Sequence, residues 1–338
     1  MDRPWVYLIG VSALLLALAA PFLGVRWGSS DEQLLPPEAT SRVAQQTYAR
    51  HFGGDQTWAY AMIEGATPEL TADYLRRVAA VPGISRTTVQ RVNPSTGVVF
   101  ATIGWPGTAQ SESSQSLVRA IRDVPVGGGA AAYVGGPSAL TVDQLHLVRE
   151  RIPVMIALVA TAMFLLLLVS FRSILLPLKA IVTTALSITA SFGVVTWVFQ
   201  EGHLAGPLGF TAPGYLEVST PIVMGAILFG LSMDYEVFLL SRIKEEWDRT
   251  GDNRASVAHG LARTGRIITG AAVLLAVVIG AFVTSGVVIV KMLGLGMLVA
   301  VLLDATVVRG LLVPAAMRLL GRWNWWLPGR TAHARADT

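Results

Sequence analysis

The stretch 225–240, GAILFGLSMDYEVFLL, decides how this chain is read. It is apolar enough to cross a membrane, yet Asp234, Tyr235 and Glu236 follow one another within it. A carboxylate at hydrocarbon depth costs from about 3 kcal/mol on insertion scales to more than about 10 kcal/mol on an isolated helix. A chain keeps such a group where it faces a protein interior, a cavity or an ion path. Asp234 is therefore the first candidate functional residue.

Composition indicates that the whole chain is an integral membrane protein. Of its 338 residues, 53% are hydrophobic and only 14% are charged, whereas soluble domains have about 25% charged residues. The net charge of +4 does not indicate a nucleic-acid partner, because the basic residues flank apolar segments rather than forming one patch. The absence of cysteine excludes disulfides, thiolate chemistry and cysteine-bound metals.

Six apolar segments each approach the ~20 residues that cross a hydrocarbon core. They cover residues 5–23, 152–171, 177–199, 217–240, 267–286 and 292–317. Basic residues crowd segment 241–266 and follow the sixth span, whereas the segment 200–216 has none. The positive-inside rule then places both termini and a basic loop 241–266 in the cytoplasm. We expect membrane helix 1 within 1–24, an extracytoplasmic domain over 25–150, helices 2 and 3 over 151–200, an outer loop over 201–216, helices 4–6 over 217–318 and a cytoplasmic tail over 319–338.

The first span has an alternative interpretation as a cleaved signal peptide. Arg3, an apolar run and the small residues Ala17-Leu18-Ala19 resemble a signal sequence with its cleavage site. Asp2 weakens the basic start, and five further spans follow. We therefore favour an uncleaved membrane helix. At the other end, Arg330–Thr338 is polar and is expected to be disordered.

The outer domain 25–150 is predicted to contain two α/β units. Thr67 and Pro68 provide an N-cap and a first helical position for a helix ending near Ala80. With the other expected elements the order is β-α-β-β-α-β, the ferredoxin-like arrangement: strands 56–64, 84–92, 97–105 and 130–134, and helices 67–80 and 111–124. A last helix, 138–151, is expected to run directly into the second span and to couple the domain to the membrane.

Asp234, Tyr235 and Asp304 are the candidate proton-relay residues. Asp234 lies eight residues before Arg242, or about 12 Å inside the basic end of its helix, and the Tyr235 hydroxyl can hydrogen-bond a carboxylate. A role for Asp234 as polar contact between helices is the alternative. Asp304 is a second carboxylate within an apolar run, and a structural network and a relay role remain equally open for it. Glu236 points away from Asp234 and is expected to be a separate, interfacial group.

Asp304 and Arg309 lie five residues apart on one helix, which is not a facing spacing in an α-helix. Each is therefore expected to find its partner on another helix. The small residues Ala272, Ala276, Gly280 and Thr284 repeat every four positions, which favours close helix packing. Trp323-Asn324-Trp325-Trp326 is expected to be an interfacial aromatic anchor.

No cofactor or metal site is predicted. The five histidines, at 51, 146, 203, 259 and 333, show no metal-ligand spacing. Gly294-x-Gly296 does not follow a strand, and the chain has no Walker motif. The expected function is therefore not enzymatic, and work must be driven by an ion gradient or by a partner.

The chain resembles one half of the resistance–nodulation–division (RND) superfamily, and more closely the mycobacterial-membrane-protein-large (MMPL) lipid exporters. The resemblance rests on three stretches. These are GLSMDYEVFLLSRIKEE at 230–246, GLARTGRIIT at 260–269, and LDAT at 303–306 together with WNWWLP at 323–328. It implies that Asp234 and Tyr235 form the proton relay of the fourth span. Family members usually contain two such halves, and this chain is most like the C-terminal half.

These observations predict a multi-pass plasma-membrane protein that uses the proton-motive force to export lipid or another hydrophobic compound. It would act as a half-transporter, either a separately encoded half or a fragment, with a second half as a homo- or hetero-oligomeric partner. The substrate would be hydrophobic, protons would be the coupling ion, and no nucleic acid would bind. An auxiliary subunit of protein translocation of the SecF type, and a non-transporting regulatory remnant, are the alternatives.

Overall fold

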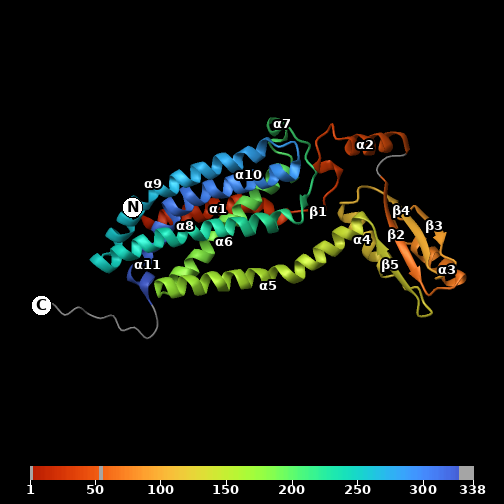
Figure 1. Cartoon of the computed structure of the whole chain (residues 1–338), viewed down its shortest axis with the longest axis horizontal. Helices are drawn as coiled ribbons and strands as arrows, with labels where there is room; N and C mark the ends of the chain where they lie inside the picture. The colour runs from red at the N-terminus through yellow and green to blue at the C-terminus, as the bar shows by residue number, and fades with distance from the viewer. Residues whose placement is uncertain (1–2, 53–55, 327–338) are drawn as a thin grey trace.

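The computed structural model describes residues 3–52 and 56–326. Figure 1 shows an elongated molecule with a bundle of long helices at one end and a small sheet domain at the other. Six helices in the described part of the chain are long and apolar enough to cross a membrane, which confirms the six predicted spans. The tail predicted at Arg330–Thr338 lies outside the described residues.

The first five spans are α1 (Pro4–Ala19), α5 (Pro137–Phe171), α6 (Leu175–Val195), α8 (Thr220–Thr250) and α9 (Asn253–Gly280). Short 3₁₀ or π turns extend α1 to Gly24, α6 to Gln200 and α9 to Thr284. The sixth span has three parts, which are α10 (Val288–Leu302), the π-helical stretch η5 (Leu303–Leu312) and α11 (Val313–Leu320). The last span therefore changes its pitch where Asp304 lies.

The basic segment 241–266, expected to be a loop, is almost entirely helical. Helix α8 continues to Thr250 and α9 begins at Asn253. The turn needs only Gly251, whose φ is 66°, and Asp252, whose carboxylate accepts the N–H of Arg254 at 2.8 Å. Glycine in the left-handed region ends α8, and the aspartate caps α9. The two spans thus form a helical hairpin with a tight turn, and both helices continue past their apolar segments into the basic segment.

Helix α5 joins the sheet domain to the bundle without a break. Its 35 residues run from Pro137 to Phe171 and include Pro153. Figure 1 shows it passing from the sheet along the whole bundle. The prediction that the helix at 138–151 continues into the second span is confirmed.

The sheet domain has the element order β-α-β-β-α-β that the sequence predicts. Its elements are β2 (Gln56–Glu64), α3 (Pro68–Ala79), β3 (Arg86–Val92), β4 (Val99–Pro106), α4 (Glu112–Arg122) and β5 (Ala131–Gly135). The strands form one antiparallel sheet in the order β3-β4-β2-β5. As expected, the Thr67 side chain accepts the N–H of Leu70 at 3.3 Å and Pro68 begins α3.

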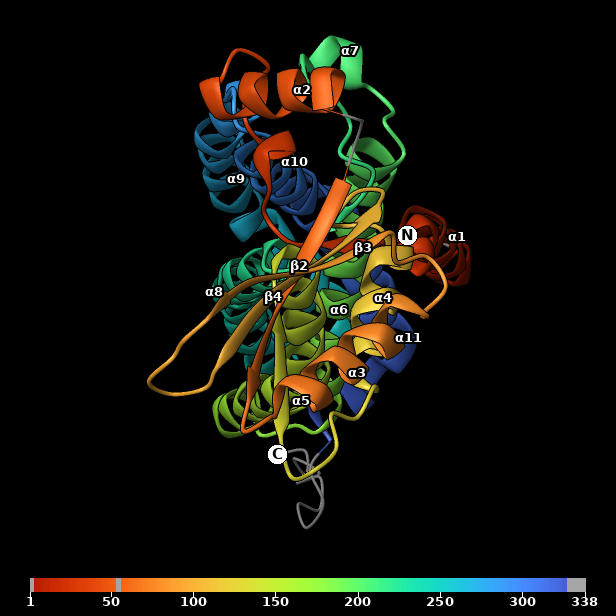
Figure 2. The same cartoon turned by 90° about the vertical axis from the view of Figure 1, so that its right-hand side faces the viewer.

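One face of this sheet is covered and the other is open. Tyr74 and Val78 of α3 and Ile121 of α4 pack in one core with Ile103 and Trp105 of β4, and Figure 2 shows both helices on the same side of the sheet. On the opposite face Trp58, Tyr60 and Phe100 form a row of neighbouring rings. Trp58 and Tyr60 are exposed. An uncovered row of aromatic side chains is typical of a contact surface.

Residues 25–52 do not join this sheet, although they fall within the predicted outer domain. Strand β1 (Trp27–Gly28) pairs in parallel with β6 (Leu216–Glu217), which precedes α8. The helix α2 (Thr40–Phe52), which the sequence did not predict, follows, and Figures 1 and 2 place it near α7 (Ala205–Leu208), beside the bundle. The N–H of Ser29 donates to the Gln110 side chain at 2.8 Å. This linker therefore contacts both the bundle and the sheet domain.

Two glycines bring the spans into close contact. A Cβ at Gly193 of α6 would lie 2.0 Å from the carbonyl oxygen of Leu18 in α1. A Cβ at Gly294 of α10 would lie 2.7 Å from the Cβ of Phe282. Small residues at helix contacts let backbones approach in membranes. The Gly294-x-Gly296 pattern is thus explained by packing.

The segment Trp323–Trp326 connects three helix ends. Asn324 is buried, and its side-chain amide donates to the carbonyls of Met317 and Gly321, both at 2.7 Å. Its own carbonyl accepts the Ser173 hydroxyl at 2.6 Å, and Trp325 stacks on Trp247 at 5.8 Å between ring centroids. The segment is therefore a structural joint between the turn before α6, helix α8 and the end of the last span, in addition to the anchor that the sequence predicts.

Candidate functional site

The centre of the candidate site is an ion pair within the π-helical stretch η5. Asp304 Oδ2 lies 2.6 Å from Arg309 Nη2. The expectation that these residues find partners on other helices is therefore wrong for Asp304. A π-helix closes its hydrogen bonds between residues five apart, so its wider turn brings positions i and i+5 onto the same face.

Arg309 ties this pair to α8. Its Nη2 also donates to the carbonyl oxygen of Ser232 at 2.8 Å, and its guanidinium lies 4.9 Å from the ring centroid of Tyr235. The Arg309 side chain is only 2% exposed. Within the described residues, its Nε and Nη1 atoms have no hydrogen-bond partner. A buried arginine with spare donors can bind a water or a second carboxylate.

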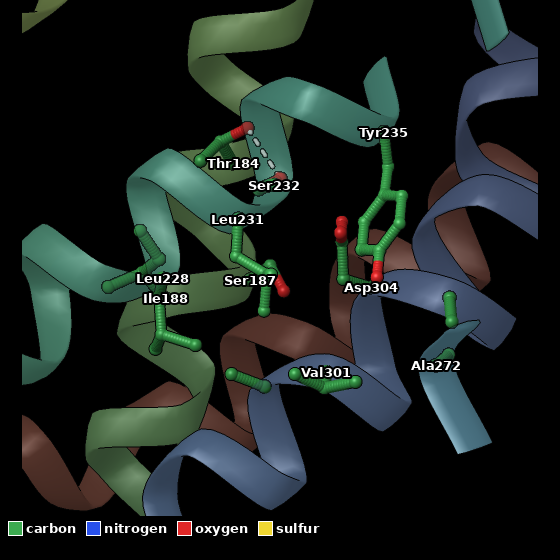
Figure 3. Close-up of a pocket in the computed structure, with 12 residues that line it drawn as sticks. Thr184, Ser187, Ile188, Leu228, Leu231, Ser232, Tyr235, Ala272, Val301 and Asp304 are labelled. Atoms are coloured by element: carbon green, nitrogen blue, oxygen red, sulfur yellow. Dashed lines mark hydrogen bonds between the residues drawn. The ribbon is translucent and has the colours of Figure 1, made fainter. Parts of the chain in front are cut away.

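A small cavity lies beside the ion pair. Its volume is about 20 Å³, which is enough for one water molecule. Tyr235 and Asp304 line it together with Thr184, Ser187 and Ser232. Figure 3 shows the Tyr235 side chain reaching from α8 towards η5, beside Asp304, and the contact between the Thr184 and Ser232 hydroxyls. Hydroxyls, a carboxylate and space for water can together pass a proton.

Asp234 lies outside this cluster. It is exposed, whereas Tyr235 is half-buried, because consecutive residues of an α-helix point about 100° apart. Asp234 does not line the cavity. Among the described residues, no hydrogen bond or ion pair with Asp234 is found. Of the three predicted relay residues, the structure therefore brings Tyr235 and Asp304 together and turns Asp234 away from them.

Glu236 is not the interfacial group that the sequence predicts. Its side chain is 5% exposed and pairs with the equally buried Lys179 of α6, with 3.3 Å between Oε1 and Nζ. Lys179 lies in the first turns of α6. The four-residue spacing of Ser232 and Glu236 was the available signal, since it places both side chains on one face of α8.

The stripe of small residues on α9 is partly buried in the bundle. Ala272 is buried and lines the cavity, and a Cβ at Gly280 would only touch Leu298 of α10 at 3.8 Å. Thr284, at the end of the stripe, is exposed. In the described ranges 3–52 and 56–326, no group of three or more His, Asp or Glu side chains could hold a metal ion.

The arrangement of six candidate spans and one sheet domain is similar to part of a solved membrane pump. A solved structure of a heavy metal efflux pump matches 83% of this chain and 37% of that chain, with a TM-score of 0.50 and 13% identity. That likeness concerns the fold alone. The chain belongs to the MMPL family, because the profile of that family matches residues 85–336.

Curated relatives support the same family. A putative membrane protein of Streptomyces coelicolor is 42% identical over 98% of this chain and 46% of its own length. The trehalose monomycolate exporter MmpL3 of Mycobacterium tuberculosis is 33% identical over 97% of this chain and 36% of its own length. The haem uptake protein MmpL11 of the same species is 35% identical over 98% of this chain and 36% of its own length. The chain thus spans less than half the length of these relatives.

Proposed function

We propose that this chain is a half of a proton-driven exporter of lipid or another hydrophobic compound. The observation that carries the proposal is the Tyr235, Asp304 and Arg309 cluster beside a water-sized cavity inside the spans. Ionisable groups at membrane depth mark ion paths and proton relays. The family match also favours this proposal over an auxiliary subunit of protein translocation.

The exposure of Asp234 supports the proposal of a second half. An ionised carboxylate facing lipid is costly, so this face of α8 requires a cover. A second half presenting polar groups to Asp234 would supply it, and the relatives are more than twice as long as the segment that they share with this chain. Asp234 would then receive protons at the interface between halves, and Tyr235 would connect that interface to Asp304.

The sheet domain would be the ferredoxin-like, porter-type domain on the extracytoplasmic side. In that orientation both chain ends and the basic tip of the α8–α9 hairpin face the cytoplasm. The exposed aromatic row of Trp58 and Tyr60 would contact acyl chains or the matching domain of the second half. Protons moving inward release about 2.3 kcal/mol per 100 mV of membrane potential, which makes coupling to export energetically possible.

The test is reconstitution of the chain, alone and with a candidate second half, into liposomes with a pH gradient. Trehalose monomycolate and a fluorescent phospholipid serve as probes, since one relative is named for exporting the former. We expect probe movement that a protonophore abolishes and that requires two halves. Probe movement that the protonophore does not reduce would contradict proton coupling. Full activity of a strictly monomeric chain would contradict the requirement for a second half.

A further inference from the structure

The Lys179–Glu236 ion pair is a second buried charge pair in the bundle, and the relay described above does not use it. The two side chains are 7% and 5% exposed. Within the described residues, neither Lys179 Nζ nor Glu236 Oε1 has a hydrogen-bond partner. Such a sparsely bonded buried pair contributes little net stability, because desolvation offsets its attraction. Its presence therefore calls for another explanation.

The pair lies one helical turn from the cavity. Ser232 and Glu236 are four residues apart on α8, which is about 6 Å along one face of the helix. Ser232 lines the cavity and its carbonyl binds Arg309. Glu236 is therefore the next polar group on that face towards the basic end of α8.

Helix α6 carries a matching polar stripe. Thr183, Thr184 and Ser187 are all buried there, and Lys179 lies four residues before Thr183, whose hydroxyl donates to the Lys179 carbonyl at 3.0 Å. The Thr184 hydroxyl lies 3.4 Å from that of Ser232. Polar side chains of both helices thus line the cavity on the side of the Lys179–Glu236 pair, and Thr183 is the next polar residue of α6 towards Lys179.

Asp304 and Glu236 also act on each other. Their negative charges are close enough to interact, while Arg309 offsets the charge of Asp304 and Lys179 that of Glu236. Two carboxylates and two cations share this region, and Tyr235, which precedes Glu236 in the sequence, lines the cavity beside Asp304. Protonation of one carboxylate removes a negative charge near the other and therefore lowers the affinity of the other for a proton. The two sites are therefore coupled.

We propose that Glu236, held by Lys179, is the inner proton acceptor of the relay. This inference rests on the proposed proton-driven function. The proton leaves the Asp304 carboxyl group, crosses the cavity through water and the Thr184 and Ser232 hydroxyls, and binds the Glu236 carboxylate. Asp304 is then an anion paired with Arg309 again. Release of the proton from Glu236 to the water at the basic end restores the ion pair with Lys179.

The central variant is the double change Lys179→Gln with Glu236→Gln, which removes both charges and keeps similar shapes. We expect wild-type insertion and melting temperature, because a buried ion pair can be replaced by neutral groups without loss of stability. A reversed pair, Lys179→Glu with Glu236→Lys, keeps an ion pair but moves the carboxylate to α6. The matched control is Arg242→Gln with Glu245→Gln, which neutralises an exposed pair on α8.

Two measurements test the proposal. In purified protein, infrared titration of protonated carboxyl groups should show that the double variant titrates differently from the wild type at Asp304, with Asp304→Asn identifying its signal. In liposomes, movement of trehalose monomycolate should fall at least about tenfold in the double and reversed variants and should no longer depend on inner pH. The control should match the wild type in both measurements.

The outcomes separate this inference from the function on which it rests. Wild-type transport that a protonophore does not reduce would overturn the proposed function and the relay with it. Protonophore-sensitive transport that the double or reversed variant retains in full would overturn the role of Glu236 alone. An unshifted Asp304 titration would do the same.

Discussion

Asp304 and Arg309 lie five positions apart on one helix and contact each other at 2.6 Å. The Arg309 guanidinium also donates a hydrogen bond to the Ser232 carbonyl of α8. The π-helical stretch η5 makes this spacing possible. The pair therefore fixes both the local pitch of the last span and its position against α8.

Replacing Arg309 by Gln should destabilise the protein strongly. It leaves the Asp304 carboxylate without its cation, and breaking one side of a buried pair costs about 3–5 kcal/mol. Unfolding in mild detergent measures the loss. Adding Asp304→Asn to Arg309→Gln should recover most of it, and a single variant as stable as the wild type would show that the pair is not structural.

Asp234→Asn should leave stability unchanged and abolish transport. The side chain is exposed and, in the described part of the chain, has no bonded partner to lose, whereas the amide cannot carry a proton. The melting temperature checks the unchanged stability. Lipid movement in liposomes checks the loss of transport, which should be at least about tenfold. Asp234→Glu keeps a carboxyl group and should retain part of the activity. Wild-type transport by Asp234→Asn would remove it from the relay.

Gly193→Ala should force α1 and α6 apart. Its Cβ would lie 2.0 Å from the Leu18 carbonyl oxygen and 2.8 Å from the Ala19 Cα, and backbone atoms cannot move aside as a side-chain tip can. Overpacking of this kind costs about 1–3 kcal/mol. Gly230→Ala is the control, because its Cβ meets no atom within 4 Å, and alanine should raise helix stability slightly. Equal melting temperatures for both variants would argue against the close contact.

Asn324→Ala should weaken the joint at the end of the last span. The variant removes the donor that the Met317 and Gly321 carbonyls share, while Met317 keeps the bond from the Asn253 amide at 3.0 Å. Each lost hydrogen bond costs about 0.5–1.5 kcal/mol. Thermal unfolding measures this loss. Trp323→Phe is the control, since Trp323 is 55% exposed, and it should differ little from the wild type.

Asp31→Asn should stabilise the protein near neutral pH. Burial raises the pKa of Asp31, while interactions with Tyr215 and the Gln33 N–H act in the opposite direction. A raised carboxyl pKa means that folding favours the neutral form, so Asp31 lowers stability as the pH rises from about 3.9 through the folded-state pKa. Asparagine has no such ionisation and keeps an acceptor for Gln33. Its stabilising effect should be absent below about pH 4 and should grow as the pH rises through the raised folded-state pKa of Asp31, as melting curves across this range would show.

Much of this fold could be predicted from the sequence because its signals are local. Apolar runs near the length of a membrane crossing identified all six spans. The Thr67 cap and Pro68 located α3, and alternating strands around it gave the order of the sheet domain. These signals depend only on neighbouring residues.

The arrangement of the site could be predicted only in part. Asp234, Tyr235 and Asp304 stood out because charges in apolar runs are rare, but α-helical spacing separated Asp304 from Arg309, and no sequence rule announces a π-helical stretch. The partner of Glu236 is Lys179 of α6, 57 positions earlier in the sequence. Such a contact depends on how the helices pack, which local sequence signals do not give. The β1–β6 pairing joins residues still farther apart in the sequence, with Trp27 opposite Leu216.

That pairing also determines which parts of the molecule move together. The Leu216 N–H donates to the Arg26 carbonyl at 2.8 Å and the Val218 N–H to that of Gly28 at 3.0 Å, so the start of α8 is held against the chain that leaves α1. One residue later, Ser29 is hydrogen-bonded to Gln110 of the sheet domain. The start of α8 is therefore linked to the sheet domain through residues 26–29, and this link also meets α5, because the Thr141 hydroxyl donates to the Ser29 hydroxyl at 3.0 Å. The spans and the sheet domain are thus connected twice, directly through α5 and through the β1–β6 pairing at the start of α8, and the two connections meet at Ser29.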